Sequence, residues 1–84
     1  MSELRDLIDI VARALADEPN KVRVSEAEHH GTILIEVYAA PRDMGKMIGR
    51  QGRTIAAMRT LAGVTGERLK KRVTLEVRDE PPPN

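Results

Sequence analysis

The sequence has no cysteine, phenylalanine or tryptophan, and Tyr38 is its one residue of the Phe, Trp and Tyr class. The lack of cysteine excludes a disulfide framework, thiolate metal sites and a cysteine nucleophile, and it fits a reducing compartment. A single such ring excludes binding modes in which several exposed rings stack on nucleobases. Long apolar runs are also missing, because charges recur every few residues from the start, as in Met-Ser-Glu-Leu-Arg-Asp. We therefore predict neither a signal peptide nor a membrane span, and we expect a cytoplasmic protein with no membrane partner.

The length of 84 residues leaves room for one domain, and a domain of this size buries only about 60–65% of its unfolded surface. Charge is unevenly distributed along it. Residues 1–41 hold four Lys or Arg against eight Asp or Glu, whereas residues 42–78 hold ten against three. This asymmetry suggests that the second half faces a polyanion, although charge alone fits a solvated basic surface equally well.

Apolar residues recur at helical spacing near the N-terminus, with Ser2 placed to cap the helix and Pro19 placed to end it. The stripe comprises Leu4, Leu7, Ile8, Val11, Ala12 and Leu15. Three later segments alternate polar and apolar residues as strands do: one from Lys21, one over 32–39 and one over 73–77. The run His29-His30-Gly31 predicts a hairpin turn between the first two, which makes that pair antiparallel.

Two helices are expected between the second and third strands. The short one covers roughly residues 43–48 and stops at Gly49, and the longer one begins at about Arg53. Its inward residues are expected to be Ile55, Met58, Leu61 and Ala62, while Gly63 and Gly66 weaken its far end. A helical crossover of this kind implies a parallel pair with a right-handed connection.

The order is therefore α-β-β-α-α-β, an α+β fold in which helices cover one face of a three-stranded mixed sheet. We predict a single domain over residues 1–78. Residues 79–84 end in Pro-Pro-Pro-Asn, which cannot pair in a sheet, and are predicted to be a disordered Pro-rich tail.

The stretch 43–55 carries the clearest functional signal. Gly49 and Gly52 stand three apart between the two helices, with Lys46, Arg50 and Arg53 around them. Glycine lets a ligand approach the main chain, and the N-terminus of the second helix favours phosphate. We interpret this stretch as a clamp for a phosphate backbone.

Other chemistries have little support. Neither Gly-x-Gly-x-x-Gly nor Gly-x-x-x-x-Gly-Lys-Ser/Thr occurs, so neither common nucleotide-binding motif is present. His29 and His30 have no evident third metal ligand, and no nucleophile stands near a base in a motif context, so we expect no metal, no cofactor and no enzyme. The run Lys70-Lys71-Arg72 fits either a second phosphate contact or a solvated turn, and the pattern favours the turn.

The octet Ile48-Gly49-Arg50-Gln51-Gly52-Arg53-Thr54-Ile55 resembles the Ile-Gly-x-x-Gly-x-x-Ile signature of KH domains. The extra helix and strand precede the core here, as in the prokaryotic type II KH fold. With Asp43-Met-Gly-Lys-Met-Ile-Gly before the loop and Lys71-Arg72-Val73 before the last strand, residues 1–78 resemble the small bacterial KhpA family. Gly63 and Gly66 depart from the family pattern.

The resemblance implies a non-catalytic protein that grips about four nucleotides of single-stranded RNA, as a bacterial RNA chaperone or post-transcriptional regulator. A preference for RNA over DNA rests on the resemblance alone. The implied RNA-binding residues are Lys46, Ile48, Gly49, Arg50, Gln51, Gly52 and Arg53, and Arg59 would add to the positive field. An apolar floor for the bases would come from Met47 or Ile48, Ile55 and residues 33–37, although helical spacing favours a core position for Ile48 and Ile55.

A four-nucleotide grip is weak, so a second copy or a partner domain is expected. The resemblance suggests a homodimer and a heterodimer with a larger KH-containing partner. The alternative function is a protein-interaction module in which RNA binding is weak or incidental. Exposed parts of the long helix around Met58, Leu61 and Val64 would carry that interface.

Overall fold

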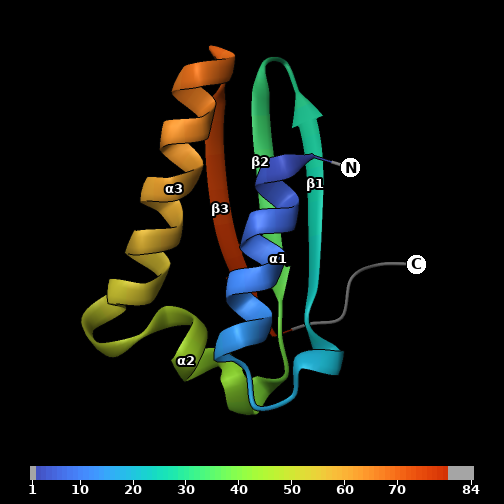
Figure 1. The fold of residues 1–84 in the computed structure, drawn as a ribbon, viewed down its shortest axis with the longest axis vertical. Helices are drawn as coiled ribbons and strands as arrows, with labels where there is room; N and C mark the ends of the chain where they lie inside the picture. Colours follow the sequence, from blue (N-terminus) through green and yellow to red (C-terminus); the bar gives the residue numbers. More distant parts are fainter. Residues whose placement is uncertain (1, 80–84) are drawn as a thin grey trace.

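The computed structural model describes residues 2–79, so all but the first residue of the predicted tail lies outside the described part. The elements follow the predicted order, which confirms the α+β prediction (Figure 1). The helices are α1 (Glu3–Leu15), α2 (Met44–Ile48) and α3 (Arg53–Leu69), and the strands are β1 (Arg23–His29), β2 (Thr32–Tyr38) and β3 (Arg72–Arg78). Short 3-10 turns occupy Pro19–Lys21, Pro41–Asp43 and Arg50–Gly52.

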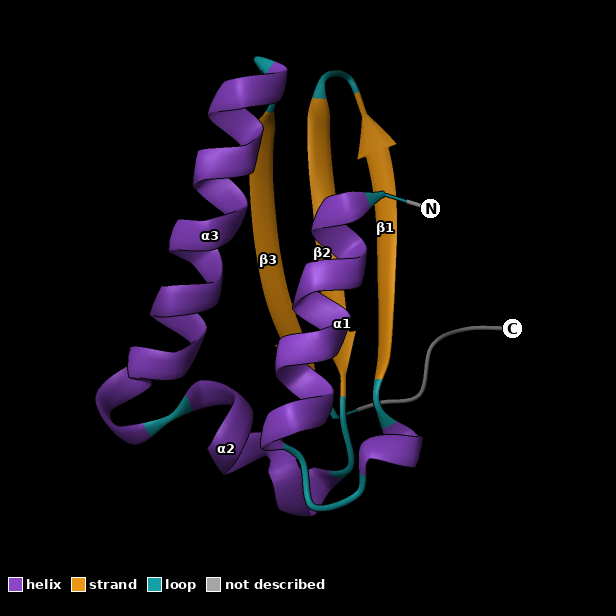
Figure 2. Cartoon of the chain, viewed as in Figure 1, coloured by secondary structure: helices purple, strands orange, loops and turns teal. Residues whose placement is uncertain are grey.

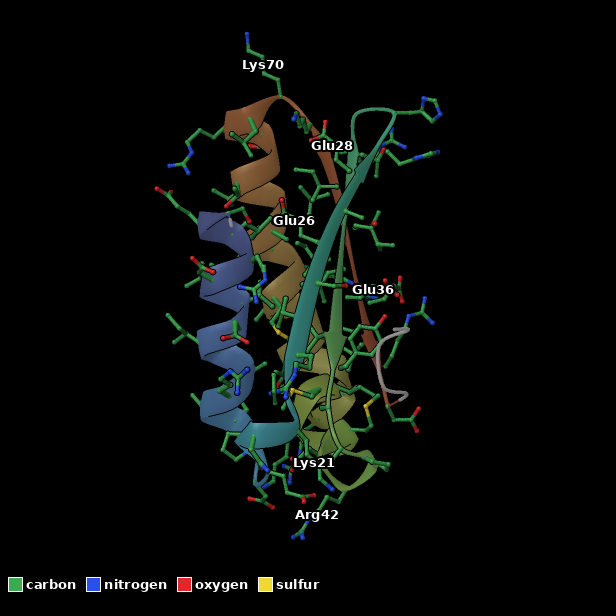
Figure 3. The ribbon with its side chains drawn as sticks, turned by 90° about the vertical axis from the view of Figure 1, so that its right-hand side faces the viewer. Lys21, Glu26, Glu28, Glu36, Arg42 and Lys70 are labelled. Atoms are coloured by element: carbon green, nitrogen blue, oxygen red, sulfur yellow. The ribbon has the colours of Figure 1, made fainter. Side chains whose placement is uncertain are left out.

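The sheet has the order β1-β2-β3, with β2 in the centre. β1 and β2 are antiparallel and β2 and β3 are parallel, which confirms the mixed sheet. The hairpin turn is the pair His30 and Gly31, with φ of 51° and 78°, as a two-residue turn that matches strand twist requires. α1 and α3 lie on one face of the sheet, and within residues 2–79 the other face carries no helix (Figures 2 and 3).

The core lies between the sheet and the helices. Ser2 caps α1 as predicted, because its Oγ accepts a hydrogen bond of 2.9 Å from the Arg5 N–H. Leu7 and Leu15, at the edges of the predicted stripe, remain 41% and 37% exposed. The buried apolar residues of α1, β2, α2, α3 and β3 are Leu4, Ile8, Ala12, Ile33, Ile35, Val37, Met47, Met58, Ala62 and Leu75.

The orientation of α3 corrects two predictions. Leu61 was expected to face inward but is 41% exposed. Met58 is 1% exposed, which confirms that it faces inward and corrects the expectation that it also belongs to an exposed interface. Met58 and Ala62 are four residues apart and share the buried face, whereas Leu61 lies about a quarter-turn from its centre. The apolar type of Leu61 therefore did not determine its side of the helix.

The far end of α3 is held by close packing. The helix continues to Leu69 and ends at Lys70, which has φ of 59°. Gly66 is buried against β3, and a Cβ there would lie 2.6 Å from the Lys71 carbonyl oxygen and 2.8 Å from Val73 Cγ2. Gly66 therefore permits the contact between α3 and β3.

Between residues 2 and 79, no helix is both long enough and apolar enough to cross a bilayer. The same residues contain no group of three or more His, Cys, Asp or Glu side chains placed to hold a metal ion. The rings of His29 and His30 pack edge to face with their centroids 4.3 Å apart.

Candidate nucleic-acid interface

The glycine loop is a tight, hydrogen-bonded connection between α2 and α3. The Gly49 N–H donates to the Gly45 carbonyl at 2.8 Å and ends α2, and the Gly52 N–H donates to the Gly49 carbonyl at 3.0 Å. Three of its residues have positive φ: Gly49 at 81°, Gln51 at 56° and Gly52 at 73°. A left-handed conformation is costly for a residue with a Cβ, and such strain is concentrated at functional sites. The fold therefore holds Gln51 in a conformation that costs free energy, as it also does His30 in the hairpin and Lys70 at the end of α3.

The two glycines have different roles. A Cβ on Gly49 would lie 2.2 Å from Thr54 Oγ1 and 2.7 Å from the Thr54 backbone nitrogen. A Cβ on Gly52 would meet nothing nearer than Ile55 Cγ2 at 4.0 Å. Gly49 is thus required for the loop to close on α3, whereas only Gly52 leaves open space where a ligand could approach the backbone.

The tip of the loop presents an unpaired cation. Arg50 is exposed, and across residues 2–79 its side chain has no hydrogen bond or ion pair. Arg53 donates from Nη2 to Gln51 Oε1 at 3.2 Å. The N-cap residue of α3 is Gly52, which has no side chain to accept from the first backbone N–H groups, so the positive end of the helix dipole faces the loop. This combination favours an anion at the loop.

Lys46, in contrast, has an intramolecular partner. Its Nζ lies 2.6 Å from Asp17 Oδ1, just beyond the end of α1. Arg42 lies 3.8 Å from the same carboxylate and 3.9 Å from that of Glu18. The structure therefore groups Lys46 and Arg42 with two carboxylates, while Arg50 keeps its charge uncompensated.

The two carboxylates are positioned by the buried side chain of Asp43. Its Oδ1 and Oδ2 accept hydrogen bonds of 3.0 Å each from the backbone N–H groups of Asp17 and Glu18. These bonds, with smaller contributions from Lys46 and Arg42, lower the pKa of the Asp43 carboxyl despite its burial. Asp43 thus joins the end of α1 to the start of α2, a contact that sequence reasoning did not identify.

Asp43→Asn is expected to lower the melting temperature at pH 7, because an amide can accept only one of the two hydrogen bonds well. The pKa of Asp43 is lower in the folded chain, so its stabilisation is present above its unfolded pKa of about 3.9 and is lost as pH falls through the folded value. Melting curves of both proteins should therefore differ at pH 7 and converge toward pH 2; a constant difference would contradict this role.

The candidate apolar floor is reduced to one well-exposed residue. Ile48 is 40% exposed, which corrects the expectation that it is core. Met47 is fully buried, as are Ile35 and Val37, and Ile55 is half-buried against the core. Ile48 is thus the candidate whose apolar surface a base could contact beside the loop.

Arg59 lies on the flank of α3 that faces β3, an edge strand of the sheet. Its Nε donates to the Leu75 carbonyl at 3.2 Å, and its Nη2 lies 3.9 Å from Glu76 Oε1. The side chain remains half-exposed. The structure therefore places a cation midway along the α3–β3 edge, held by a backbone oxygen.

Comparison with known proteins gives consistent matches over nearly the whole chain. Residues 5–77 match the family model described as KhpA/KhpB, KH domain. An RNA-binding protein KhpA of Aquifex aeolicus is 43% identical over 77 residues, covering 92% of this chain and 98% of that protein. Its counterpart from Caldanaerobacter subterraneus is 46% identical over 72 residues, covering 86% and 96%.

A solved structure shares the fold at low sequence identity. It is a crystal structure of Era in complex with MgGDPNP and nucleotides 1506–1542 of 16S ribosomal RNA. The match has a TM-score of 0.63 at 17% identity and covers 93% of this chain but 30% of the Era chain. The chain thus corresponds in fold to one part of a larger protein.

Proposed function

The chain belongs to the KhpA/KhpB family of KH domains, and from this premise we propose that it is a non-catalytic protein that binds single-stranded RNA. The relatives carry the name RNA-binding protein, which supports RNA as the ligand. We place the grip, about four nucleotides long, at the loop from Gly49 to Gly52 in a type II KH fold.

The observation that carries this proposal is the unpaired charge of Arg50 on a loop with open backbone. A phosphate at this position would meet the Arg50 guanidinium and the N-terminus of α3, and Gly52 leaves space for it. Ile48 would offer apolar surface to a base. Each phosphate that is neutralised releases condensed counterions, so binding should weaken steeply as salt rises.

Replacing Arg50 and Gln51 with Asp tests the proposal. We expect the double variant to bind a single-stranded RNA at least roughly tenfold more weakly, since a charged hydrogen bond contributes about 1.5–3 kcal/mol, and its plot of log affinity against log salt should be less steep. Both side chains are exposed, and Asp tolerates the left-handed conformation at position 51. Fluorescence anisotropy across a salt series measures both quantities.

Asn20→Asp with Lys21→Asp is the matched control, because it also replaces an adjacent exposed amide and cation and makes the same change in charge. It should retain most of the wild-type affinity. Equal affinities and salt slopes for the folded Arg50→Asp/Gln51→Asp variant and the wild type would refute binding through the loop.

An interaction module is the second candidate function, and exposed apolar residues favour it. On α3, Leu61 and Val64 are 41% and 63% exposed, and on α1, Leu7 and Ile10 are 41% and 65% exposed. We propose that this surface serves a homodimer or a heterodimer with a larger KH-containing partner, which would raise the effective concentration of a weak RNA grip. If interaction were the sole function, the Arg50→Asp/Gln51→Asp variant would retain its function in full.

We further propose that the protein acts in the bacterial cytoplasm as an RNA chaperone or post-transcriptional regulator. A four-nucleotide grip with strong salt dependence suits reversible contact with many RNAs better than tight binding to one sequence. Contacts of the loop with phosphate groups hold the RNA backbone and do not distinguish one base sequence from another.

A further inference from the structure

The end of α3 opposite the glycine loop carries two cations that nothing in residues 2–79 neutralises. Lys70 ends the helix in a left-handed conformation, and Arg72 begins β3. In the described part of the chain neither side chain has a hydrogen bond or ion pair, whereas Lys71 between them lies 2.8 Å from Glu28 Oε1. Figure 3 shows Lys70 extending away from the body of the molecule at this end.

The local structure explains the positive charge at Lys70 but not the one at Arg72. A cation at position 70 suits the negative end of the α3 dipole. The carbonyls of Gly66 and Glu67 there already accept the Lys71 and Lys70 N–H groups at 2.8 and 3.1 Å. Arg72 lies in a strand, where no dipole attracts it, and nothing in the described fold neutralises it.

The α3–β3 edge connects this pair to the glycine loop. α3 has 17 residues from Arg53 to Leu69, so the two ends lie about 25 Å apart at a rise of 1.5 Å per residue. Figure 1 shows the helix running beside β3 between them. Arg59 lies along this edge, and its helical neighbours Ala56 and Gly63 are exposed and small. No long side chain at these two positions obstructs the flank.

Local charge at the far end is positive. Arg68, Lys70, Lys71 and Arg72 lie there with three carboxylates: Glu67, Glu3, which lies 3.5 Å from Arg68 Nη2, and Glu28, which lies 2.8 Å from Lys71 Nζ. A polyanion held at the loop would therefore gain a second attractive region by continuing along the edge, because the side chains of Lys70 and Arg72 have no hydrogen bond or ion pair within residues 2–79.

We propose that Lys70 and Arg72 form a second phosphate-binding site, which receives the continuation of the same RNA strand beyond the nucleotides held at the loop. This inference rests on the proposed RNA-binding function and extends it to a longer site. Single-strand sites in other proteins extend over about 4–16 nucleotides, so a strand that reaches both regions is within the usual range. Such a site selects for the length of the unpaired RNA and leaves base selection unchanged.

The test compares fluorescent oligouridylates of four and ten nucleotides in anisotropy titrations. Lys70→Gln with Arg72→Gln is expected to weaken binding of the longer RNA about tenfold and to reduce its salt slope by about 1.4, because each single-strand phosphate contact contributes about 0.7. Binding of the tetranucleotide should be unchanged. Lys21→Gln with Arg23→Gln is the control, because it removes the same residue types at the same spacing where the other edge strand, β1, begins.

The proposal is overturned if the Lys70→Gln/Arg72→Gln protein binds the longer RNA as tightly as wild type, or if the control weakens it equally. An equal loss for both RNA lengths also overturns it, since the pair would then act at the loop or on the fold. Urea unfolding of each variant excludes a fold defect. If the loop variant alone loses binding, the proposed function stands and this extension fails; if wild type binds neither RNA, both fail.

Discussion

Replacing Gly66 with alanine is expected to destabilise the fold by about 1–3 kcal/mol, the usual cost of overpacking a core. A methyl group there would overlap the Lys71 carbonyl oxygen at 2.6 Å and Val73 Cγ2 at 2.8 Å. The backbone oxygen cannot rotate away, so α3 would have to move off β3. This cost exceeds the gain of about 0.5–1 kcal/mol that alanine brings to a helix interior. Urea denaturation followed by circular dichroism measures the difference.

Gly63 provides the matched control on the same helix. It is exposed, and a Cβ there would meet no atom within 4 Å. Gly63→Ala should therefore stabilise the chain by about 0.5–1 kcal/mol through helix propensity. Opposite signs at two glycines three residues apart would identify packing as the cause, and a gain in stability from both substitutions would show that α3 and β3 do not require close approach.

These glycines show where sequence reasoning stops. In the sequence, Gly63 and Gly66 both count as weak points of a helix, because propensity is a property of one residue. Gly66 instead faces a strand that begins six residues later. The cap at Ser2 and the turn at His30 and Gly31 were predictable, since capping and turn geometry depend on neighbours in the chain. The inward face of α3 was predicted only in part because the apolar residue Leu61 lies outside it.

In the candidate site, too, the features set by neighbours in the sequence were predictable and the long-range contacts were not. The loop residues 49–53 are adjacent in the sequence, so their grouping could be predicted from a motif. The contacts of Lys46 with Asp17 and of Arg59 with Leu75 join residues 29 and 16 positions apart. No local pattern signals them, and the acidic character of the first half gave no indication of which cations it would neutralise.

The charge asymmetry gains a structural interpretation from these contacts. Carboxylates of the first half pair with cations of the second half at several places: Asp17 with Lys46, Glu28 with Lys71, Glu36 with Arg78 and Glu3 with Arg68. Arg50, Lys70 and Arg72 remain unpaired within residues 2–79. The excess positive charge is therefore concentrated at the two ends of α3, where the two proposed phosphate contacts lie.

Gly49→Ala and Gly52→Ala should separate folding from ligand approach. Gly49→Ala is expected to cost about 2–6 kcal/mol, since the conformation with φ of 81° and ψ of 167° is nearly exclusive to glycine and the methyl group would collide with Thr54. Gly52→Ala has only its left-handed φ to oppose it, at about 1–2 kcal/mol, and its methyl group projects into open space.

The two variants should therefore differ in stability more than in RNA binding. Gly49→Ala should lose both, because the loop cannot close on α3. Gly52→Ala should remain folded and lose RNA affinity, because its methyl group occupies the space that a phosphate backbone would enter. Urea denaturation and anisotropy on the same samples measure both properties. A folded Gly52→Ala protein with undiminished affinity would mean that the backbone at residue 52 does not approach the RNA, and the clamp would then depend on Arg50 and the α3 N-terminus alone.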